Sequence, residues 1–412
     1  MDDVIVVGAG PAGNNTALGL ASKGYAVTVI DSGHNIGEKL CTGIVGQECT
    51  RRFPIDPALV YREASAAEMI APYAGHVRIE ASGPRARIID RVAYVESFAR
   101  RARAAGACYL LGQRVLQVIP QADGVTVITD EGRYRSRVLV LAAGFGSPLT
   151  RQLGLGTVPD YVTGAQAAVS TDGVSEVEVH LGHDVAPGFF SWLVPTSPGR
   201  ALAGLLVRRQ AQVHLDRFIQ RQRREGKITS VIGTAACWGV PLRPLRRTYR
   251  DRVLVVGDAA GQVKPTTGGG IYYALLASEI ASQTLAEALE ADDLSAARLR
   301  RYQRRWKGLL SQELEVGYSA RRLFEALTDR QISSLVRQAG ANGLRYDLAT
   351  CPDMAFDWHS RLIGKVMGHP VLGGALRLIN PLLARLAHPP DPAFTFSTAP
   401  GNRPDSLADL SP

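Results

Sequence analysis

Two glycine-rich segments of this 412-residue chain contain the residue types that bind a phosphorylated ligand. Near the N-terminus, Gly8, Gly10 and Gly13 form a G-x-G-x-x-G motif, and Asp31 follows Gly13 by 18 residues. Glycines let a backbone approach a pyrophosphate, and an acid about 20 residues further on suits the hydroxyls of an adenosine ribose. The segment therefore predicts a dinucleotide site, and the alternative is a bare structural turn.

The second segment, residues 252–274, combines a carboxylate with bare backbone N–H groups. Asp258 follows the apolar run 253–256, and three glycines, 268–270, precede a long helical stretch. NAD needs only the first segment, whereas FAD adds a ribityl chain and an isoalloxazine ring. Asp258 suits the ribityl hydroxyls, and the glycines can bring N–H donors to the flavin or its pyrophosphate. We therefore predict FAD as the cofactor, and the alternative is that Asp258 merely caps a helix.

The elements that must position these residues follow the pattern of a Rossmann-type fold. Apolar runs predict strands over 3–7, 25–30 and 253–256, and a helix over 14–23. A further helix is predicted over 92–105, and Arg91 beside its start faces either the cofactor or solvent. The residues predicted to contact FAD are Gly8, Gly10, Pro11, Ala12, Gly13, Asp31, Ser32, Arg91, Ala143, Gly144, Gly257, Asp258, Gly268, Gly269, Gly270 and Ile271.

Composition and charge limit the other classes of protein. The hydrophobic share of 46% and charged share of 21% are typical of a globular protein. The five cysteines show neither C-x-x-C nor metal-ligand spacing, so we predict no metal and a reducing, cytoplasmic location. The first strand begins at Asp3, which leaves no room for a signal peptide, and no uncharged apolar run reaches about 18 residues.

The net charge of +9 comes mostly from clustered arginines. No aromatic-studded basic motif and no zinc-ligand spacing accompanies them, so no nucleic-acid partner is predicted. An anionic membrane surface and a diphosphate-bearing substrate are two interpretations of the charge. Ordinary solvated helix faces are the third.

The predicted fold class is α/β, with a Rossmann-type FAD-binding domain, an inserted β-sheet substrate domain and a helical C-terminal region. Further strands are predicted near Tyr109 and over 115–119, 125–129, 138–141, 165–170, 177–181, 190–194 and 201–207. The predicted domains are 1–150 (FAD-binding, first part), 151–250 (substrate sheet), 251–294 (FAD-binding, return segment), 295–388 (helical region) and 389–412 (a disordered Pro-rich tail).

Two features beyond the nucleotide motifs suggest chemistry. Alternation along the strand 190–194 places Phe190, Trp192 and Val194 on one face, where they form either the wall of a pocket or an ordinary core. The loop 38–44 contains Cys41 and follows the ribose-binding strand, so the chain can turn beneath a flavin ring there. A single cysteine is more often a small hydrophobic residue than a catalytic group.

Taken in order, the motifs resemble the geranylgeranyl reductase family of flavoproteins, which is related in fold to p-hydroxybenzoate hydroxylase, over about residues 1–340. The family's Cys-containing loop is approximated by Cys41-Thr42-Gly43, and its aromatic-x-Trp-x-Phe-Pro signature is matched by Phe190, Trp192, Val194 and Pro195. Residues 257–260 and 265–271 match Gly-Asp-Ala-Ala and Pro-x-Thr-Gly-Gly-Gly-Ile, and a long helix over 302–324 follows.

The chain departs from the family pattern at several positions. Ala143 replaces an aspartate, so the FAD contact there is expected through the backbone. Thr42 replaces a frequent glycine, Val194 a phenylalanine, and Lys264 an aspartate before the proline. These changes bear on the substrate rather than on flavin binding.

The resemblance implies reduction of isolated C=C bonds in a polyprenyl chain, with hydride from N5 of reduced flavin and a proton for the other carbon. Cys41 is the candidate for the proton path, with a water or a tyrosine as the alternative. Phe190, Trp192 and Pro195 would contact the substrate, a prenyl lipid or a prenyl diphosphate. Which prenyl chain it is does not follow from the residues.

The source of electrons and the place of action are further expectations. No second G-x-G-x-x-G lies in a strand-helix unit, so the reductant is expected to be docking NAD(P)H, a ferredoxin-like donor or another protein. Apolar residues interleaved with basic ones over 362–386 fit a helix on the inner face of a membrane, or one packed on the enzyme's own core.

Other functions share these motifs. An aromatic monooxygenase has the same fold, and a prenyl-lipid carrier without flavin is the non-enzymatic alternative, which the full fingerprint and Asp258 disfavour. A flavin halogenase needs a lysine between the flavin and the substrate. No lysine occurs between Lys39 and Lys227, which argues against a halogenase.

Overall fold

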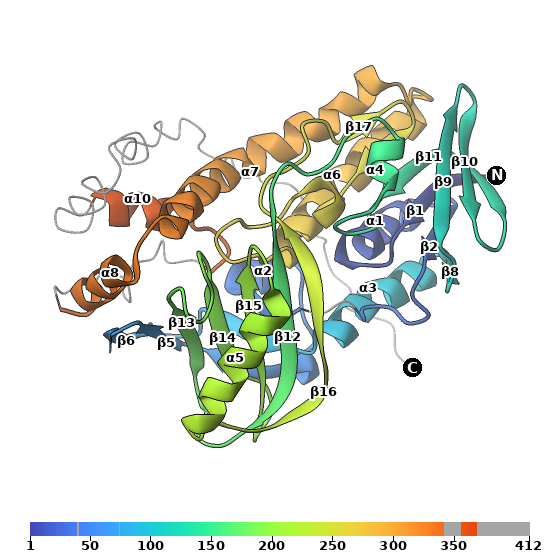
Figure 1. The fold of residues 1–412 in the computed structure, drawn as a ribbon. Helices are drawn as coiled ribbons and strands as arrows, with labels where there is room; N and C mark the ends of the chain where they lie inside the picture. The colour runs from blue at the N-terminus through green and yellow to red at the C-terminus, as the bar shows by residue number, and fades with distance from the viewer. Residues whose placement is uncertain (39–40, 74, 342–355, 369–412) are drawn as a thin grey trace, which may run out of the picture.

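A computed structural model describes residues 1–38, 41–73, 75–341 and 356–368 (Figure 1). Five parallel strands, in the order β18-β11-β1-β2-β8, form the centre of an eight-stranded sheet. Both faces of these strands are covered, which is why they read as continuous apolar runs. Along β1, Val4 and Val6 face the helices, whereas Ile5 and Val7 face the opposite cluster. The strands of this sheet are β1 (Asp2–Val7), β2 (Val27–Asp31), β8 (Cys108–Leu111), β9 (Val115–Gln121), β10 (Gly124–Thr129), β11 (Arg133–Leu141), β17 (Tyr249–Arg250) and β18 (Val253–Val255).

Four helices cover one face of this sheet: α1 (Pro11–Ala21), α3 (Arg91–Ala104), α6 (Ile271–Glu290) and α7 (Ala296–Glu325). Helix α1 begins three residues earlier than predicted, because Gly10 serves as its N-cap and the fixed φ of Pro11 suits the first helical position. At the start of α3, the Asp90 carboxylate accepts a hydrogen bond from the Ala93 N–H at 3.0 Å. That cap places Arg91 in the first turn of α3.

A second, seven-stranded sheet has the order β16-β12-β15-β14-β13-β5-β6. Helix α5 (Ala211–Arg224) packs on one of its faces through Leu215 and Phe218, against residues such as Leu193 and Leu205. The opposite face carries Trp192, Val194 and other apolar side chains that face a cavity. The strands are β5 (Ala66–Ala71), β6 (Gly75–Glu80), β12 (Tyr161–Thr171), β13 (Val177–Leu181), β14 (Phe190–Pro195), β15 (Arg200–Val207) and β16 (Ile228–Pro241).

The boundary between the two sheets does not coincide with residue 150. Strands β5 and β6 belong to the range 1–150 predicted for FAD binding, yet β5 pairs in parallel with β13 of the second sheet. A three-stranded sheet also lies within that range, made by β3 (Ile44–Gly46), β7 (Ala86–Ile89) and β4 (Val60–Ala64). Long-range pairing of this kind leaves no local signal in the sequence, and the division into domains stays a prediction.

The remaining helices are short, and two of them lie near the end of α7 (Figure 1). Helix α8 packs on β5 and β6, and α10 packs on α7. Their bounds are α8 (Asp329–Ala341) and α10 (Ser360–Gly368), and the others are α2 (Gln47–Arg52), α4 (Leu149–Gln152), η1 (Pro57–Leu59) and η2 (Gly257–Ala260).

The α/β architecture predicted from the sequence is confirmed. The predicted amphipathic stretch 362–386 is described only as far as residue 368, within α10, and the predicted tail 389–412 lies outside the described residues. In the described part of the chain, none of the helices combines the length and the apolarity that crossing a membrane requires.

Candidate active site

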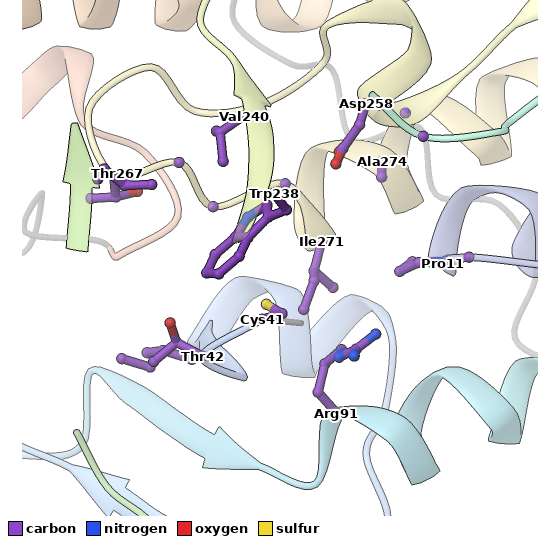
Figure 2. A pocket seen from close by; sticks show the side chains of 18 of the residues that line it. Pro11, Cys41, Thr42, Arg91, Trp238, Val240, Asp258, Thr267, Ile271 and Ala274 are labelled. Carbon is purple, nitrogen blue, oxygen red and sulfur yellow. The ribbon is translucent and has the colours of Figure 1, made fainter. Parts of the chain in front are cut away.

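A cavity of about 840 Å³ lies between the eight-stranded sheet and the inner face of the seven-stranded sheet (Figure 2). Four parallel strands supply its lining at their carboxyl ends, through residues 8–12, 31–33, 142–144 and 257–258. This edge is where open α/β sheets bind ligands. The volume is within the range of sites that enclose a cofactor or another large organic ligand.

The three glycines of the N-terminal motif serve three different purposes. Gly8 has φ +108°, and an added Cβ would lie 2.3 Å from the Ala142 carbonyl oxygen. An added Cβ on Gly13 would lie 1.8 Å from the Gly8 carbonyl oxygen, so α1 packs directly on the turn. Gly10 has nothing within 4 Å of that position and lines the cavity. Only Gly10 therefore leaves room for a ligand at the N-terminus of α1.

Asp31 lies beside this turn at the end of β2. Its Oδ2 accepts a hydrogen bond from the Ala9 N–H at 2.6 Å, and its Oδ1 accepts one from the Gly33 N–H at 2.7 Å. Each carboxylate oxygen keeps a further lone pair for a donor such as a hydroxyl. The side chain is therefore fixed in the cavity wall with acceptor capacity to spare.

The second glycine turn brings another helix N-terminus to the same cavity. Helix α6 starts after Gly270, and an added Cβ there would lie 2.9 Å from Asp258 Oδ1. Figure 2 shows Asp258 above the first turn of α6, near Ala274. Asp258, the glycines 268–270 and Ile271 all line the cavity. The N-termini of two helices thus face one cavity, an arrangement that favours an anionic ligand.

Arg91 adds a buried positive charge to this wall. The residue is 9% exposed and lines the cavity, and burial lowers the pKa of its guanidinium. The nearby Cys41 and Asp90 oppose that shift. Among the described residues, no acceptor forms a hydrogen bond with the guanidinium. Its donors are therefore available to an anion in the cavity, and a pyrophosphate is one.

These observations test whether the site fits the predicted FAD. The open space at Gly10, the spare acceptor capacity of Asp31 and the Arg91 cation match a pyrophosphate between two sugar-like groups. Asp258 lies at the second turn, where a ribityl chain would need an acceptor. The residues present therefore fit the cofactor.

The loop with Cys41 enters the cavity between the two sheets. Gly43 has φ +72°, and an added Cβ would lie 2.7 Å from the Ile89 carbonyl oxygen, so the loop is packed closely on β7. The Gly43 N–H points to Cys41 Sγ at 3.5 Å. Figure 2 shows the thiol directed into the same space as Trp238 and Ile271.

The far wall of the cavity is apolar. Phe190, Trp192 and Val194 all line it, as period-two alternation predicted. Pro195 does not line it, because the preceding Val194 already faces the cavity and successive side chains of a strand point to opposite faces. The predicted substrate contact of Pro195 therefore has no support in this geometry.

Most of the remaining predicted residues lie together. Gly13 is absent from the cavity lining because it packs against Gly8. The predicted residues that line the cavity are Gly8, Gly10, Pro11, Ala12, Asp31, Ser32, Cys41, Arg91, Ala143, Gly144, Phe190, Trp192, Gly257, Asp258, Gly268, Gly269, Gly270 and Ile271. Their individual roles stay predictions.

Sequence reasoning missed a wall formed by the C-terminal region. Phe356 and Ile363 line the cavity, next to Thr266. Lys264, 4% exposed, donates from Nζ to the Phe356 carbonyl oxygen at 2.9 Å, and burial lowers its pKa. The only signal in the sequence was the departure of Lys264 from the family pattern, which gave no hint of a partner about 90 residues away.

His359 connects this wall to the glycine turn. Its Nε2 lies 3.0 Å from the Phe356 carbonyl oxygen, which accepts only, so Nε2 carries the proton. Nδ1 then accepts a hydrogen bond from the Thr266 hydroxyl. Burial lowers the pKa of His359 to about 3, and the Lys264 cation adds to the effect. Burial and the Lys264 cation therefore favour a neutral imidazole at this contact.

A third buried cation, Arg321, lies at the apolar end of the cavity. The residue is 4% exposed, and its guanidinium carbon lies 3.9 Å from the centre of the Phe189 ring. Nη1 donates to the Gly188 carbonyl oxygen at 2.9 Å and to Glu325 at 3.3 Å. Burial lowers its pKa to about 10. Glu325 partly neutralises this charge, whereas Nε and Nη2 of Arg321 have no hydrogen-bond partner among the described residues.

Two further residues of the site belong to no sequence motif and are placed there by the pairing of strands. Trp238 of β16 and Gln166 of β12 lie on the cavity side of the seven-stranded sheet, and Trp238 lines the cavity. Gln166 is 1% exposed and hydrogen-bonds to Trp192. A single glutamine within an apolar strand was a usable signal, since a buried amide needs a partner.

Comparison with known proteins shows what this chain is similar to. Residues 2–176 match the family described as pyridine nucleotide-disulphide oxidoreductase. The chain is 31% identical over 357 residues to digeranylgeranylglycerophospholipid reductase 2 of Methanopyrus kandleri. The aligned region covers 81% of this chain and 89% of that protein.

Solved structures share the fold. A geranylgeranyl bacteriochlorophyll reductase-like protein of Thermoplasma acidophilum superposes with a TM-score of 0.82 at 22% identity, over 93% of this chain and 99% of that one. A p-nitrophenol 4-monooxygenase of Pseudomonas putida gives a TM-score of 0.68 at 17% identity, over 85% and 96%. At these identities the likeness establishes the fold alone.

Proposed function

This chain belongs to the geranylgeranyl reductase family of FAD-dependent oxidoreductases, and from that premise we propose that it reduces isolated C=C bonds of a polyprenyl chain within the cavity. The observation that supports the proposal is the continuity of the cavity. One end is made of glycine turns and charged groups, and the other is an apolar wall, with Cys41 between the two sheets. A nucleotide cofactor and a hydrocarbon chain can therefore occupy one enclosed space.

The residues that would hold FAD follow from the two glycine turns. Asp31 would accept from the adenosine ribose, and the N-terminus of α1 and Arg91 would neutralise the pyrophosphate. Asp258 would accept from the ribityl hydroxyls, and the turn 268–270 would offer backbone N–H groups. When bound and reduced, FAD supplies hydride from N5 for the alkene.

The apolar wall would orient the prenyl chain. Phe190, Trp192 and Val194 present large apolar surfaces to the cavity and exclude water from the reacting carbons. An isolated alkene is a poor hydride acceptor, so the orientation of its two carbons carries much of the catalysis. Arg321 at this end favours a substrate with an anionic head group, such as a prenyl diphosphate or a prenyl phospholipid.

Cys41 would deliver the proton that completes the reduction. The hydride adds to one carbon, and a proton from the thiol, replenished from water, reaches the other, so the alkene gains two hydrogens. The position of the loop 41–43 inside the cavity supports this role. A water molecule or a tyrosine in the same position is the alternative.

The decisive experiment is anaerobic. The purified protein is reduced with dithionite and mixed with geranylgeranyl diphosphate, and flavin reoxidation is followed together with mass analysis of the prenyl chain. Reoxidation with a gain of two hydrogens for each turnover is the expected result. A flavin that stays reduced until air is admitted would mean either that another prenyl lipid is the substrate or that the protein is a monooxygenase.

Two variants separate the role of Cys41 from a general effect of losing a thiol. Cys41→Ser is expected to retain FAD and to slow reoxidation by the alkene, whereas Cys108→Ser, at an exposed cysteine outside the cavity lining, is expected to match the unmodified protein. Equal rates in both variants would remove Cys41 from the proton path. A purified protein that contains no flavin would support the prenyl-lipid carrier.

The electron donor and the place of action extend the proposal. NAD(P)H or a ferredoxin-like protein would reduce the flavin. The prenyl substrate would be collected at the inner face of a membrane, where this protein would be peripheral. Binding to vesicles of anionic lipid, measured by sedimentation, tests the second point.

A further inference from the structure

We propose that Gln166 is a positioning residue for the reaction: its amide joins the Cys41 loop to Trp192 in the apolar wall and so fixes the thiol relative to the prenyl chain. The inference rests on the proposed function, because it names the contacts that hold the residues of that same site in position. It concerns residues outside every nucleotide-binding motif.

The central observation is one buried oxygen that accepts two hydrogen bonds. Gln166 Oε1 lies 3.0 Å from Thr42 Oγ1 and 3.2 Å from Trp192 Nε1. Gln166 is 1% exposed and Trp192 is 6% exposed. The three side chains therefore form a bridge from the loop, through β12, to β14.

The chemistry of the indole decides the direction of both bonds. The two atoms of an amide end cannot be told apart by shape, but an indole N–H is a donor only. The atom that faces Trp192 must therefore be the amide oxygen. Because that oxygen accepts only, the Thr42 hydroxyl must donate to it, and the hydroxyl is thereby held in one rotamer.

The register of the sheet explains how side chains on non-adjacent strands can meet. Gly204 on β15 pairs with Gln166 on one side and with Trp192 on the other. An added Cβ on Gly204 would lie 2.5 Å from the indole Cε2 and 2.8 Å from Nε1. The indole thus lies across the position where any other residue would have a side chain, and reaches the amide only because residue 204 is a glycine.

Thr42 makes the bridge specific to this loop. It immediately follows Cys41 and lines the cavity, and Gly43 on its other side is packed on β7. With one end of the loop held by β7 and its middle held by Gln166, the thiol has a defined direction. Without the Thr42 bond, Cys41 keeps its chemistry but loses its fixed position, which a proton transfer requires to within a hydrogen-bond length.

The test uses two independent readouts on the FAD-loaded protein. The first is the rate at which iodoacetamide alkylates Cys41, measured by peptide mass spectrometry with the exposed Cys108 as the internal reference. The second is the rate of flavin reoxidation by geranylgeranyl diphosphate. Thr42→Val and Gln166→Leu are each expected to change the alkylation rate of Cys41 and to slow reoxidation about tenfold, the equivalent of one lost hydrogen bond.

Three comparisons make the result specific. Thr42→Ser restores the hydroxyl and is expected to rescue both readouts. The double variant is expected to be no worse than either single variant, because both break the same bridge. Gln222→Leu removes another fully buried amide, from α5 on the opposite face of the same sheet, and is expected to leave both readouts unchanged.

Each outcome has one meaning. Unchanged alkylation and reoxidation in Thr42→Val, or additive losses in the double variant, would overturn the inference, and Thr42→Val keeps the test valid if Gln166→Leu fails to fold. If the unmodified protein does not reduce the prenyl chain but Thr42→Val still alters Cys41 alkylation, the bridge stands and the proposed function fails.

Discussion

The sharpest prediction compares two glycines of one motif that differ in what surrounds them. An alanine at Gly10 meets nothing within 4 Å, whereas an alanine at Gly13 would place its Cβ 1.8 Å from the Gly8 carbonyl oxygen. The structure therefore predicts opposite consequences for two substitutions only three residues apart. Gly13→Ala should lower the stability of the cofactor-free protein. Gly10→Ala should leave that stability unchanged and weaken only the binding of FAD.

The magnitudes follow from opposing contributions. At Gly13, alanine gains about 1 kcal/mol of helix propensity, but α1 must move by about 1 Å against backbone atoms. Overpacking against backbone lies at the upper end of its range, about 3 kcal/mol, so the net loss of stability is about 2 kcal/mol. At Gly10, alanine loses about 0.5–1 kcal/mol at an N-cap and regains about 0.4–1 kcal/mol through the unfolded chain. The apo form of Gly10→Ala should therefore stay within about 0.5 kcal/mol of the unmodified protein.

Gly10→Ala, which hardly changes the stability of the apo form, should have a large effect on the binding of FAD. A methyl group in the open space would keep the pyrophosphate from the N–H groups of α1, and a hydrogen bond to a charged group contributes about 1.5–3 kcal/mol. The Kd for FAD should rise about 10-fold to 100-fold. Gly13→Ala should also bind FAD less well, because the turn that packs on it is displaced.

The assay needs two measurements on flavin-stripped protein. Thermal unfolding of the apo form should show a lower Tm for Gly13→Ala by a few degrees and an unchanged Tm for Gly10→Ala. Titration with FAD, followed by flavin fluorescence, gives the Kd. An unchanged Kd in Gly10→Ala would refute the placement of the pyrophosphate at this turn, and an unchanged Tm in Gly13→Ala would refute the close packing of α1.

Three further predictions concern the charged and titratable groups. Asp258→Ala should lower the flavin content of the purified protein, and full flavin absorbance in that variant would remove Asp258 from the site. Arg91→Met should raise the Kd for FAD about tenfold or more, with Arg91→Lys in between, since a lysine keeps the charge but not the planar fork; equal Kd values for both would contradict a pyrophosphate contact. For His359, the folded pKa of about 3 lies below the value of about 6.5 for an unfolded histidine, so its contribution to stability is intact above pH 6.5 and is lost as the pH falls toward 3. The protection factors of residues 356–368 in hydrogen exchange, which are corrected for the slower intrinsic exchange at low pH, should therefore fall from pH 7 to pH 5, and His359→Gln, which can keep both hydrogen bonds, should remove that fall; the same pH response in both proteins would contradict the neutral imidazole.

Patterns within short stretches of sequence made one half of the site predictable. The G-x-G-x-x-G turn, Asp31 and the helix that follows are encoded within a short stretch, so spacing alone places them. Period two likewise placed Phe190 and Trp192 on one face of a strand, and both line the cavity. The second glycine turn likewise indicated Asp258, which lines the cavity, although the local pattern also allowed it as a helix cap.

The other half depends on which distant segments meet. Nothing near Gln166 indicates that Gly204 will separate it from Trp192, because strand register is a property of the whole sheet. Phe356 lines the cavity, and its carbonyl oxygen accepts a hydrogen bond from Lys264, which lies far from it along the chain. Pro195 shows the converse: a motif carried it into the predicted substrate contacts, but alternation turns it away from the cavity.

The strand order β18-β11-β1 has a consequence for how the protein is made. It sets residues 253–255 beside 133–141 and these beside 2–7, so neighbours in space leave the ribosome at very different times. A nascent chain that ends near residue 250 already contains the complete N-terminal fingerprint, but β11 lacks a strand along one edge and the turn with Asp258 does not yet exist. Pairings of such long sequence separation form slowly, and an uncovered strand edge is where chains associate wrongly. The site that would hold FAD is therefore complete only late in synthesis, and FAD could stabilise the fold only after the last central strand has been inserted.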